Sequence, residues 1–175
     1  QAMAQPPMLW KDGGVYVITG GAGGLGMIFA REIASKVIDA KIVLAGRSSL
    51  SEAKQAQLEA LKHHGKGAKV EYRVLDVSDV NAVTMCIHAL VEQYGAVNGI
   101  LHSAGVIQDN FIIKKSSEEF AAVLSPKVSG TMNLDRATQD IELDFLILFS
   151  SVAGAFGNAG QSDYAMANAY LDGYA

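Results

Sequence analysis

A glycine-rich segment at residues 19–26 constrains the fold of this 175-residue chain more than any other feature. It reads Thr-Gly-Gly-Ala-Gly-Gly-Leu-Gly and completes the run Val-Tyr-Val-Ile-Thr, whose β-branched residues are typical of a buried strand. After the glycines, residues 24–36 predict a helix whose apolar face is formed by Leu25, Ile28, Phe29 and Ile33. A strand, a tight glycine turn and a helix in this order begin a parallel α/β unit.

The same alternation of strand and helix continues to the end of the chain. Further strands are predicted at 41–45, 70–75, 97–101 and 143–149. Helices are predicted at 49–64, 79–93, 116–140 and in a final segment that carries Tyr164. Ser49 with Glu52, and Ser116 with Glu119, fit capping boxes at two of the helix starts. Strict alternation predicts parallel pairing with right-handed crossovers, and therefore an α/β fold with a doubly wound parallel sheet.

Length and composition predict a single domain. A chain of this length can bury a hydrophobic core, and its 18 glycines suit tight connections between strands and helices. Residues 1–12, which contain Pro6 and Pro7, are predicted to be a linker, and residues 13–175 the domain itself. Only five strands are predicted, whereas a six-stranded dinucleotide-binding sheet needs more chain. We therefore expect a segment of a longer protein, truncated after the helix that bears Tyr164.

Charge, cysteine content and hydropathy argue against several classes of function. The net charge of −4 and the lack of a basic block disfavour nucleic-acid binding. The single cysteine, Cys86, allows no internal disulfide and no cysteine metal set, and we expect it to pack as a small core residue. No apolar run reaches the ~20 residues of a membrane helix, and the first residues lack a signal-peptide pattern. A cytoplasmic protein that does not enter a membrane is expected.

The glycine-rich turn is interpreted as a phosphate-binding site. Glycines let the backbone approach a pyrophosphate, whose charge meets the exposed amides at the start of the following helix. The position of the turn, after a strand and before a helix, supports this interpretation, and a tight turn without a ligand is the alternative. The residues expected to contact the cofactor here are Thr19, Gly20, Gly21, Gly23, Gly24, Leu25 and Gly26.

Residues at the ends of the second and third strands indicate which dinucleotide is bound. The second strand ends in Ala-Gly-Arg-Ser, without a carboxylate, and Arg47 and Ser48 suit a ribose 2′-phosphate through charge-assisted hydrogen bonds. NADPH is therefore predicted rather than NADH, unless Arg47 is an ordinary surface charge. Asp76 is predicted to accept a hydrogen bond from the adenine amino group; the alternative is a turn cap with Ser78 and Asp79.

Several motifs, in the same order along the chain, resemble the short-chain dehydrogenase/reductase family, which has a Rossmann fold. The chain more closely resembles ketoreductase domains of modular polyketide synthases, one type of which has an acyltransferase acting in trans, and whose usual setting is antibiotic biosynthesis. The resemblance rests on residues 19–26, 45–48, Leu75-Asp76-Val77, His102-Ser103-Ala104-Gly105, 125–128, 149–151 and Tyr164-Ala165-Met166-Ala167-Asn168-Ala169. It implies that Asp76, Val77, Ser103, Ala104 and Gly105 lie beside the cofactor. His102, in place of the family's first Asn, is interpreted as a satisfied histidine at a strand end.

The resemblance also implies a catalytic tetrad. Most family members have Tyr-x-x-x-Lys, whereas this chain has Asn168 four residues after Tyr164, on the same helix face. Polyketide ketoreductases bring the lysine from the preceding long helix, where Lys127 stands here. Tyr164 is then the proton donor and Lys127 the cation near its phenol. Ser151 donates to the substrate carbonyl, and Asn168 holds a water or the lysine in a proton relay.

The same resemblance implies the substrate and the stereochemistry. Such domains reduce β-ketoacyl chains carried on the phosphopantetheine arm of an acyl carrier protein, among neighbouring synthase domains. Asp109 stands where these domains carry the last Asp of a Leu-Asp-Asp signature, although the first two positions are Ile107 and Gln108 here. Phe156 precedes Tyr164 at the position where the opposite stereochemical class usually has Trp. Both residues imply a (3R)-hydroxyl product, unless Asp109 is an ordinary loop acid.

Other functions stay open at this point. A stand-alone short-chain reductase is one alternative, but its usual Tyr-x-x-x-Lys is absent. A cofactor-binding scaffold that reduces nothing is another, although a scaffold has no need for a complete tetrad. An epimerising domain would use much the same site. The segment by itself is expected to be inactive or poorly folded.

Overall fold

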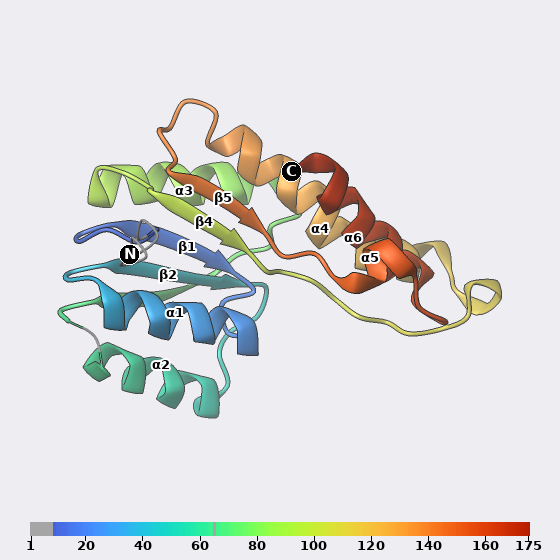
Figure 1. Cartoon of the computed structure of the whole chain (residues 1–175), viewed down its shortest axis with the longest axis horizontal. Helices are drawn as coiled ribbons and strands as arrows, with labels where there is room; N and C mark the ends of the chain where they lie inside the picture. Colours follow the sequence, from blue (N-terminus) through green and yellow to red (C-terminus); the bar gives the residue numbers. More distant parts are fainter. Residues whose placement is uncertain (1–8, 65) are drawn as a thin grey trace, which may run out of the picture.

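The computed structural model describes residues 9–64 and 66–175, so most of the predicted linker lies outside the described residues. Five strands and six α-helices are found in the described part of the chain (Figure 1). The strands are β1 (Val15–Thr19), β2 (Lys41–Gly46), β3 (Lys69–Val74), β4 (Gly99–His102) and β5 (Phe145–Leu148). The helices are α1 (Gly24–Lys36), α2 (Glu52–His64), α3 (Val80–Tyr94), α4 (Ser117–Ala137), α5 (Val152–Phe156) and α6 (Ser162–Tyr174), with a 3-10 turn, η1 (Ile112–Lys114), before α4.

The five strands pair in parallel in the order β3-β2-β1-β4-β5. The chain runs outward from β1 to β3 and then returns to β4 on the other side of β1. This is the doubly wound arrangement that the alternation of elements predicted. The strand order reverses between β1 and β4, and in open α/β sheets ligands bind outside the carboxyl ends of the strands at such a switch point.

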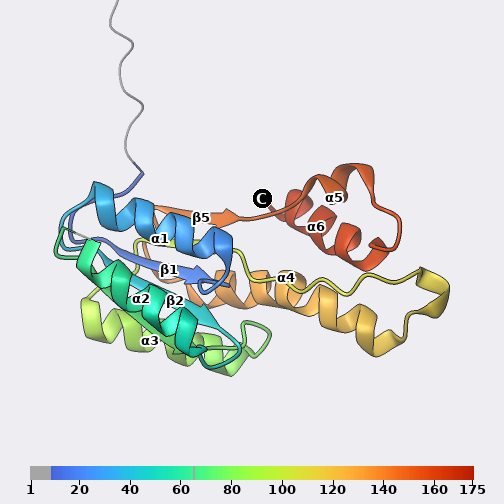
Figure 2. The ribbon, with the colours of Figure 1, turned by 90° about the horizontal axis from the view of Figure 1, so that it is seen from below.

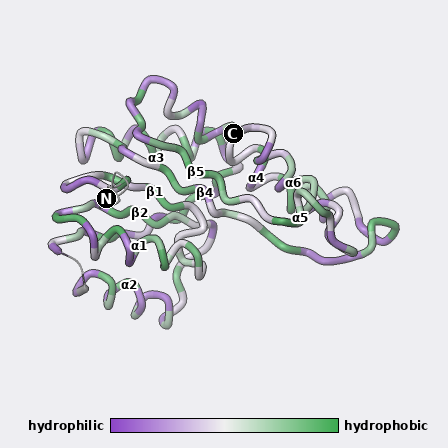
Figure 3. Tube along the Cα trace, in the orientation of Figure 1, coloured by the Kyte–Doolittle hydropathy of each residue, from purple (hydrophilic) through white to green (hydrophobic). Residues whose placement is uncertain are grey.

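Alternate residues of β1 point to opposite faces of the sheet and belong to two separate cores. Tyr16 and Ile18 pack with residues of α1 and α2, whereas Val15 and Val17 pack with residues of α3 and α4. Figure 3 shows hydrophobic residues along the central strands and more hydrophilic residues along α2. A sheet that is covered on both faces explains the continuous apolar runs of its central strands.

The predicted apolar face of α1 is only partly correct. Ile33 is buried, but Leu25 is 43% exposed and Ile28 is 60% exposed. The helix instead buries a set that includes small residues, namely Gly26, Met27, Ala30, Ile33 and Ala34. The physical reason is a close approach to the preceding turn, since a Cβ on Gly26 would lie 2.6 Å from the Gly21 Cα. The start of α1 therefore turns Gly26 toward the turn and leaves the neighbouring Leu25 and Ile28 exposed.

The two predicted capping boxes have different outcomes. Ser116 and Glu119 form the box at the start of α4, because the Ser116 side chain accepts from Glu119 N at 3.2 Å and the Glu119 side chain accepts from Ser116 N at 3.0 Å. The box predicted at Ser49 is wrong, because α2 begins at Glu52, which makes Ser51 and not Ser49 its N-cap residue. The short elements α5 and η1 have no counterpart in the sequence prediction, since neither is long enough to show a periodicity.

Trp10 packs against the domain although it falls within the predicted linker. Its ring meets the rings of Tyr16 and Phe145 edge-on, each at a centroid distance of 5.5 Å. Next to it, Lys11 pairs with Asp144 at 2.6 Å. The predicted boundary between residues 12 and 13 stays a prediction.

The helices α5 and α6 lie beyond the carboxyl edge of the sheet, together with the first part of α4 (Figures 1 and 2). α6 packs against both α4 and α5. The side chains that these helices carry therefore gather on the same side of the molecule as the switch point. Within residues 9–64 and 66–175, no helix combines the length and the hydropathy needed to cross a membrane.

Candidate active site

The carboxyl ends of β1 and β4 are joined directly at the switch point. Ser103 donates to the Thr19 carbonyl twice, from its backbone N at 3.2 Å and from its Oγ at 2.7 Å. Gly20 follows with a φ of +65°, and a Cβ there would lie 2.7 Å from Ser103 O. Only glycine avoids both the strain and the clash. The predicted phosphate-binding turn thus lies against the predicted cofactor segment at residues 103–105.

His102 connects this turn to α4. Its buried ring has Nδ1 2.7 Å from Thr19 Oγ1 and Nε2 3.0 Å from Pro126 O. Because a carbonyl can only accept, Nε2 carries the proton and Nδ1 accepts from the threonine hydroxyl. Burial, followed by the charge of Lys127, lowers the pKa of His102 to about 4, so its ring is neutral. His102 is the satisfied strand-end histidine expected from the sequence, and it fixes the segment that precedes Lys127.

The start of α1 is suited to receive an anion. Its N-cap residue, Gly23, has no side chain that could occupy the amides of the first turn, and that turn contains no acidic residue. A Cβ on Gly24 would meet nothing within 4 Å, so the space beside the first turn is open. Backbone amides and the positive end of the helix dipole are available there for a phosphate. The turn therefore fits the dinucleotide phosphates that the sequence predicted.

A hollow of about 200 Å³ continues from the turn to the end of β2. Its lining includes the predicted residues Arg47 and Ser48, and also Lys54 from α2. The hydroxyl of Tyr72 donates to Ser48 O at 2.7 Å and holds the Ser48 backbone in place. Lys54 was not selected from the sequence, because a lysine on a polar helix has no distinguishing pattern. Two cations beside a hydroxyl form a donor set that suits a phosphate.

A cavity of about 150 Å³ lies beside this hollow, and its lining includes Val77, Ala104 and Gly105. Val77 is buried, and its carbonyl accepts from Asn133 Nδ2 at 2.9 Å. Asp76 Oδ1 accepts from Ser78 N at 2.9 Å, which is the turn cap given above as the alternative. A contact between Asp76 and adenine stays a prediction.

Lys127 comes from the middle of α4 and lies beneath Gly105, where a Cβ would be 3.2 Å from the lysine Cε. The residue is 4% exposed, and its Nζ donates to Phe149 O at 2.7 Å. The same Nζ lies 5.9 Å from the centroid of the Tyr164 ring. Burial lowers the pKa of Lys127 to about 8, partly opposed by the negative charge of Asp172. Lys127 is thus a buried cation beside the phenol and not a solvated charge on the helix surface.

Asn168 lies one helical turn after Tyr164 and is fully buried. Its Nδ2 donates to Tyr164 O at 2.7 Å, and its backbone carbonyl accepts from Ser150 Oγ at 3.1 Å. Among the residues that the structure describes, Asn168 Oδ1 is one of the few buried side-chain atoms without a hydrogen-bond partner. A buried acceptor of this kind is commonly satisfied by a bound water or ligand.

Ser151 lies at the end of the segment that follows β5 and caps α5. Its Oγ accepts from Ala153 N at 3.2 Å. The hydroxyl that accepts this bond still has a proton to donate, so the capping role and a catalytic role are compatible. Since α5 packs against α6, this serine and the tyrosine helix belong to one packed unit.

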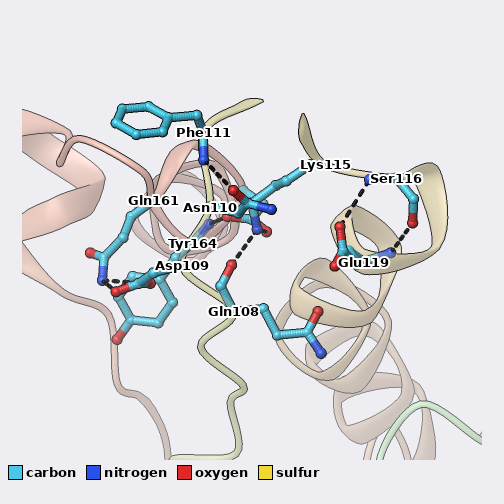
Figure 4. Close-up of polar contacts among 10 residues, drawn as sticks. Gln108, Asp109, Asn110, Phe111, Lys115, Ser116, Glu119, Gln161 and Tyr164 are labelled. Carbon is cyan, nitrogen blue, oxygen red and sulfur yellow. Dashed lines mark hydrogen bonds and ion pairs between the residues drawn. The ribbon is translucent and has the colours of Figure 1, made fainter. Parts of the chain in front are cut away.

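Asp109 belongs to the loop between β4 and α4, and Gln161 Nε2 donates to both of its carboxylate oxygens at 2.9 Å and 3.0 Å (Figure 4). Gln161 directly precedes α6 and was not selected from the sequence, because its partner is distant in the chain. Phe156 ends α5 and is 88% exposed. The stereochemical roles of Asp109 and Phe156 stay predictions.

Two positions in the fold define the class of this protein. The first is the glycine turn that opens α1 at the switch point. The second follows β5, where Ser151 is succeeded by the helix of Tyr164, whose ring lies near the buried Lys127. This arrangement is that of the short-chain dehydrogenases/reductases. Within that class, residues 14–175 match the family described as the KR domain, and the chain belongs to this family of ketoreductase domains.

Similar curated proteins are polyketide synthases. Polyketide synthase PksL of Bacillus subtilis is 54% identical over 167 residues, which are 95% of this chain and 4% of that protein. Polyketide synthase ThaG of Burkholderia thailandensis is 44% identical over 169 residues, 97% of this chain and 3% of its own length. The crystal structure of a ketoreductase domain from the bacillaene assembly line has a TM-score of 0.93 and 53% identity, covering 98% of this chain and 41% of that one. This chain therefore spans 3–4% of the length of these two synthases and less than half of that crystallised domain.

Proposed function

We propose that this domain uses NADPH to reduce a β-ketoacyl thioester on an acyl carrier protein to the (3R)-β-hydroxyacyl thioester. The proposal goes beyond membership of the ketoreductase family by naming the cofactor, the substrate, its carrier and the product. The observation that carries it is the position of Lys127, buried beside the Tyr164 ring with its ammonium 2.7 Å from Phe149 O. A cation held there has a clear use in proton transfer from the phenol.

Each catalytic side chain has a separate task in this proposal. Bound NADPH supplies the hydride that reduces the carbonyl carbon. Ser151 donates a hydrogen bond to the carbonyl oxygen and fixes its orientation. Tyr164 gives its phenol proton to the oxygen as negative charge develops on it. The charge of Lys127 stabilises the phenolate that remains.

Asn168 is proposed to take part in returning a proton to Tyr164. Its Oδ1 is a buried acceptor without a protein partner, on the same helix as the tyrosine. A water held by this oxygen would lie within a buried region that also contains the Lys127 ammonium. The asparagine and the lysine would then form one relay, with their positions exchanged relative to most of the family.

The substrate and its setting are proposed from the relatives. PksL and ThaG are polyketide synthases, and the similar crystal structure is a ketoreductase domain of an assembly line. A β-ketoacyl chain tethered to a carrier protein, with neighbouring synthase domains in the cytoplasm, is the corresponding proposal for this chain. The (3R) assignment is proposed from the resemblance at Asp109, whose carboxylate Gln161 holds at the start of the tyrosine helix.

The direct test is an assay of the full-length protein with NADPH and a β-ketoacyl chain on its carrier protein. We expect NADPH consumption together with a (3R)-hydroxyacyl product on chiral analysis. A (3S) product would contradict the stereochemical part alone. Cofactor binding without consumption would favour the scaffold, or an epimerising domain if the configuration at the α-carbon changes.

Replacing Arg47 by Ala is expected to weaken the preference for NADPH over NADH by about 10- to 100-fold, since a charge-assisted hydrogen bond contributes about 1.5–3 kcal/mol. The measurement is kcat/KM with each cofactor. Lys69→Ala is the matched control, because Lys69 is also exposed but lies at the amino end of β3, opposite the hollow. An unchanged preference in Arg47→Ala would contradict the 2′-phosphate assignment.

The reduction rate is expected to fall as the pH rises through about 8. Burial lowers the pKa of Lys127 to that value, so the ammonium is charged below about pH 8 and neutral above it. Loss of the charge removes the stabilisation of the phenolate. The effect is measured as kcat/KM at pH values from 6 to 10, spaced by roughly one pH unit. Lys127→Arg keeps its charge over this range and should remove the alkaline fall; the same fall in both proteins would assign it to another group.

A further inference from the structure

The loop between β4 and α4 is bonded to the start of α6 at several points (Figure 4). Asn110 N donates to Gly160 O at 2.9 Å, and Gln161 Nε2 donates to the carboxylate of Asp109. The third connection is an ion pair between Lys115, next to the N-cap of α4, and Asp163 in the first turn of α6. Loop and helix therefore form one polar junction beside Tyr164.

The Lys115–Asp163 pair is the buried part of this junction. The two side chains are 2% and 1% exposed. The Lys115 ammonium also donates to Gln108 O, the carbonyl directly before Asp109. Asp163 Oδ1 accepts from Tyr164 N at 2.9 Å, while Oδ2 accepts from the lysine. One ion pair thus connects the backbone beside Asp109 with the backbone of Tyr164.

Lys115 is fixed from its other side as well. The next residue, Ser116, is the N-cap of α4 and is held by the capping box with Glu119. Lys115 directly precedes this N-cap, and α4 also carries Lys127, so the ion pair holds the segment that leads into the helix of the tetrad lysine. Asp163 is favourably placed in the first turn of α6, where the helix dipole stabilises a negative charge.

A contribution to folding stability does not by itself explain why a buried ion pair stands at this position. Two charges lose their hydration when they are buried, and apolar residues of similar volume often give equal or greater stability. What the pair supplies, and an apolar contact does not, is a directional connection with several hydrogen bonds at defined atoms. Its bonds go to the two backbone segments that carry Asp109 and Tyr164.

On the basis of the proposed function, we propose that Lys115 and Asp163 are positioning residues of the ketoreductase site. Their ion pair sets the register of the substrate loop against the tyrosine helix. It thereby determines which face of the ketone is presented when Tyr164 delivers its proton. Neither side chain touches the reacting atoms, since both act through Gln108, Asp109 and Tyr164.

The test compares Lys115→Met, Asp163→Asn and the double variant in the full-length protein, with Lys114→Met as the control. Lys114 is the exposed neighbour of Lys115, so its replacement removes one positive charge and leaves the buried ion pair intact. Each single variant should lower kcat/KM for the β-ketoacyl thioester by about 10-fold or more, since small misplacements at a site are costly. The ratio of (3R) to (3S) product should fall, while the KM for NADPH should stay unchanged.

The double variant separates positioning from stability. Removing both charges leaves no buried ion without a partner, so the melting temperature should recover relative to the single variants. The product ratio should stay lowered, because the directional connection is still missing. A product ratio that recovers together with the melting temperature would show a purely structural role and overturn the proposal. Unchanged kcat/KM and product ratio in both single variants would overturn it as well.

The ion-pair proposal can also be tested if the proposed function is wrong. If the unmodified protein does not reduce the thioester with NADPH, the function is wrong, and amide hydrogen exchange then decides the fate of the ion-pair proposal. Lys115→Met should accelerate exchange in residues 106–115 and at the start of α6, whereas Lys114→Met should not. Equal exchange in the two variants would show that the pair does not hold the loop.

Discussion

Replacing Tyr164 by Phe is expected to lower kcat for ketone reduction by about 10²–10⁴-fold, the usual contribution of a positioned acid. The change removes the hydroxyl but keeps the ring that faces the Lys127 ammonium at 5.9 Å. Packing and the Asn168 bond to the Tyr164 carbonyl are retained, because that bond uses the backbone. The measurement is steady-state NADPH consumption together with the dissociation constant for NADPH, which should stay within a factor of about 3.

Tyr170→Phe is the matched control for this experiment. Tyr170 lies on the same helix and is partly buried, with its ring 5.6 Å from that of Tyr174. Loss of its hydroxyl should leave kcat unchanged. If Tyr164→Phe retained kcat while the control behaved as expected, another group would have to deliver the proton, and the assignment of Tyr164 would be wrong.

The order of the elements was predictable from local patterns. The three inner strands, β1, β2 and β4, are short and mostly apolar runs that the structure buries. The capping box of Ser116 and Glu119 is also local, and the structure contains it. Local patterns therefore predicted the order of the elements and one of the two capping boxes.

Packing distances were not predictable in the same way. The apolar spacing of α1 predicted a helix correctly, but the rotation of that helix depends on Gly26 lying against Gly21. The sequence indicated Leu25 and Ile28 because they are bulky, and the structure exposes both. The start of α2 was not predictable either, since Ser49 and Glu52 have the spacing of a capping box but the helix begins only at Glu52.

Some residues of the candidate site were predictable from local motifs, and others were not. Tyr164, Asn168 and Ser151 were selected because they stand in ordered motifs, and Lys127 because a related family supplies its lysine from that helix. Lys54, Gln161 and the Lys115–Asp163 pair stand in no local motif. The two members of that pair are 48 residues apart in the chain, and only the packing of α4 on α6 brings them together.

Replacing Lys127 by Met is expected to lower kcat by about 10²-fold or more while changing stability little. Methionine keeps an unbranched side chain in the buried space under Gly105, and removal of a buried charge relieves a desolvation cost. Against this, Phe149 O loses the donor that lies 2.7 Å away, at a cost of about 1–3 kcal/mol. The two effects oppose each other in stability, whereas in the reaction the lost charge removes the support for a phenolate at Tyr164.

Thermal unfolding and NADPH consumption, measured on the same samples, separate these effects. A melting temperature within a few degrees of the unmodified protein, with kcat strongly reduced, is the expected result, since about 1 kcal/mol shifts the midpoint by about 2–4 °C in a domain of this size. Lys127→Arg should retain part of the activity, because its charge persists even though the guanidinium is larger. Full activity in Lys127→Met would mean that the proton path does not need a cation at this position, and the swapped lysine would then be only a packing residue of α4.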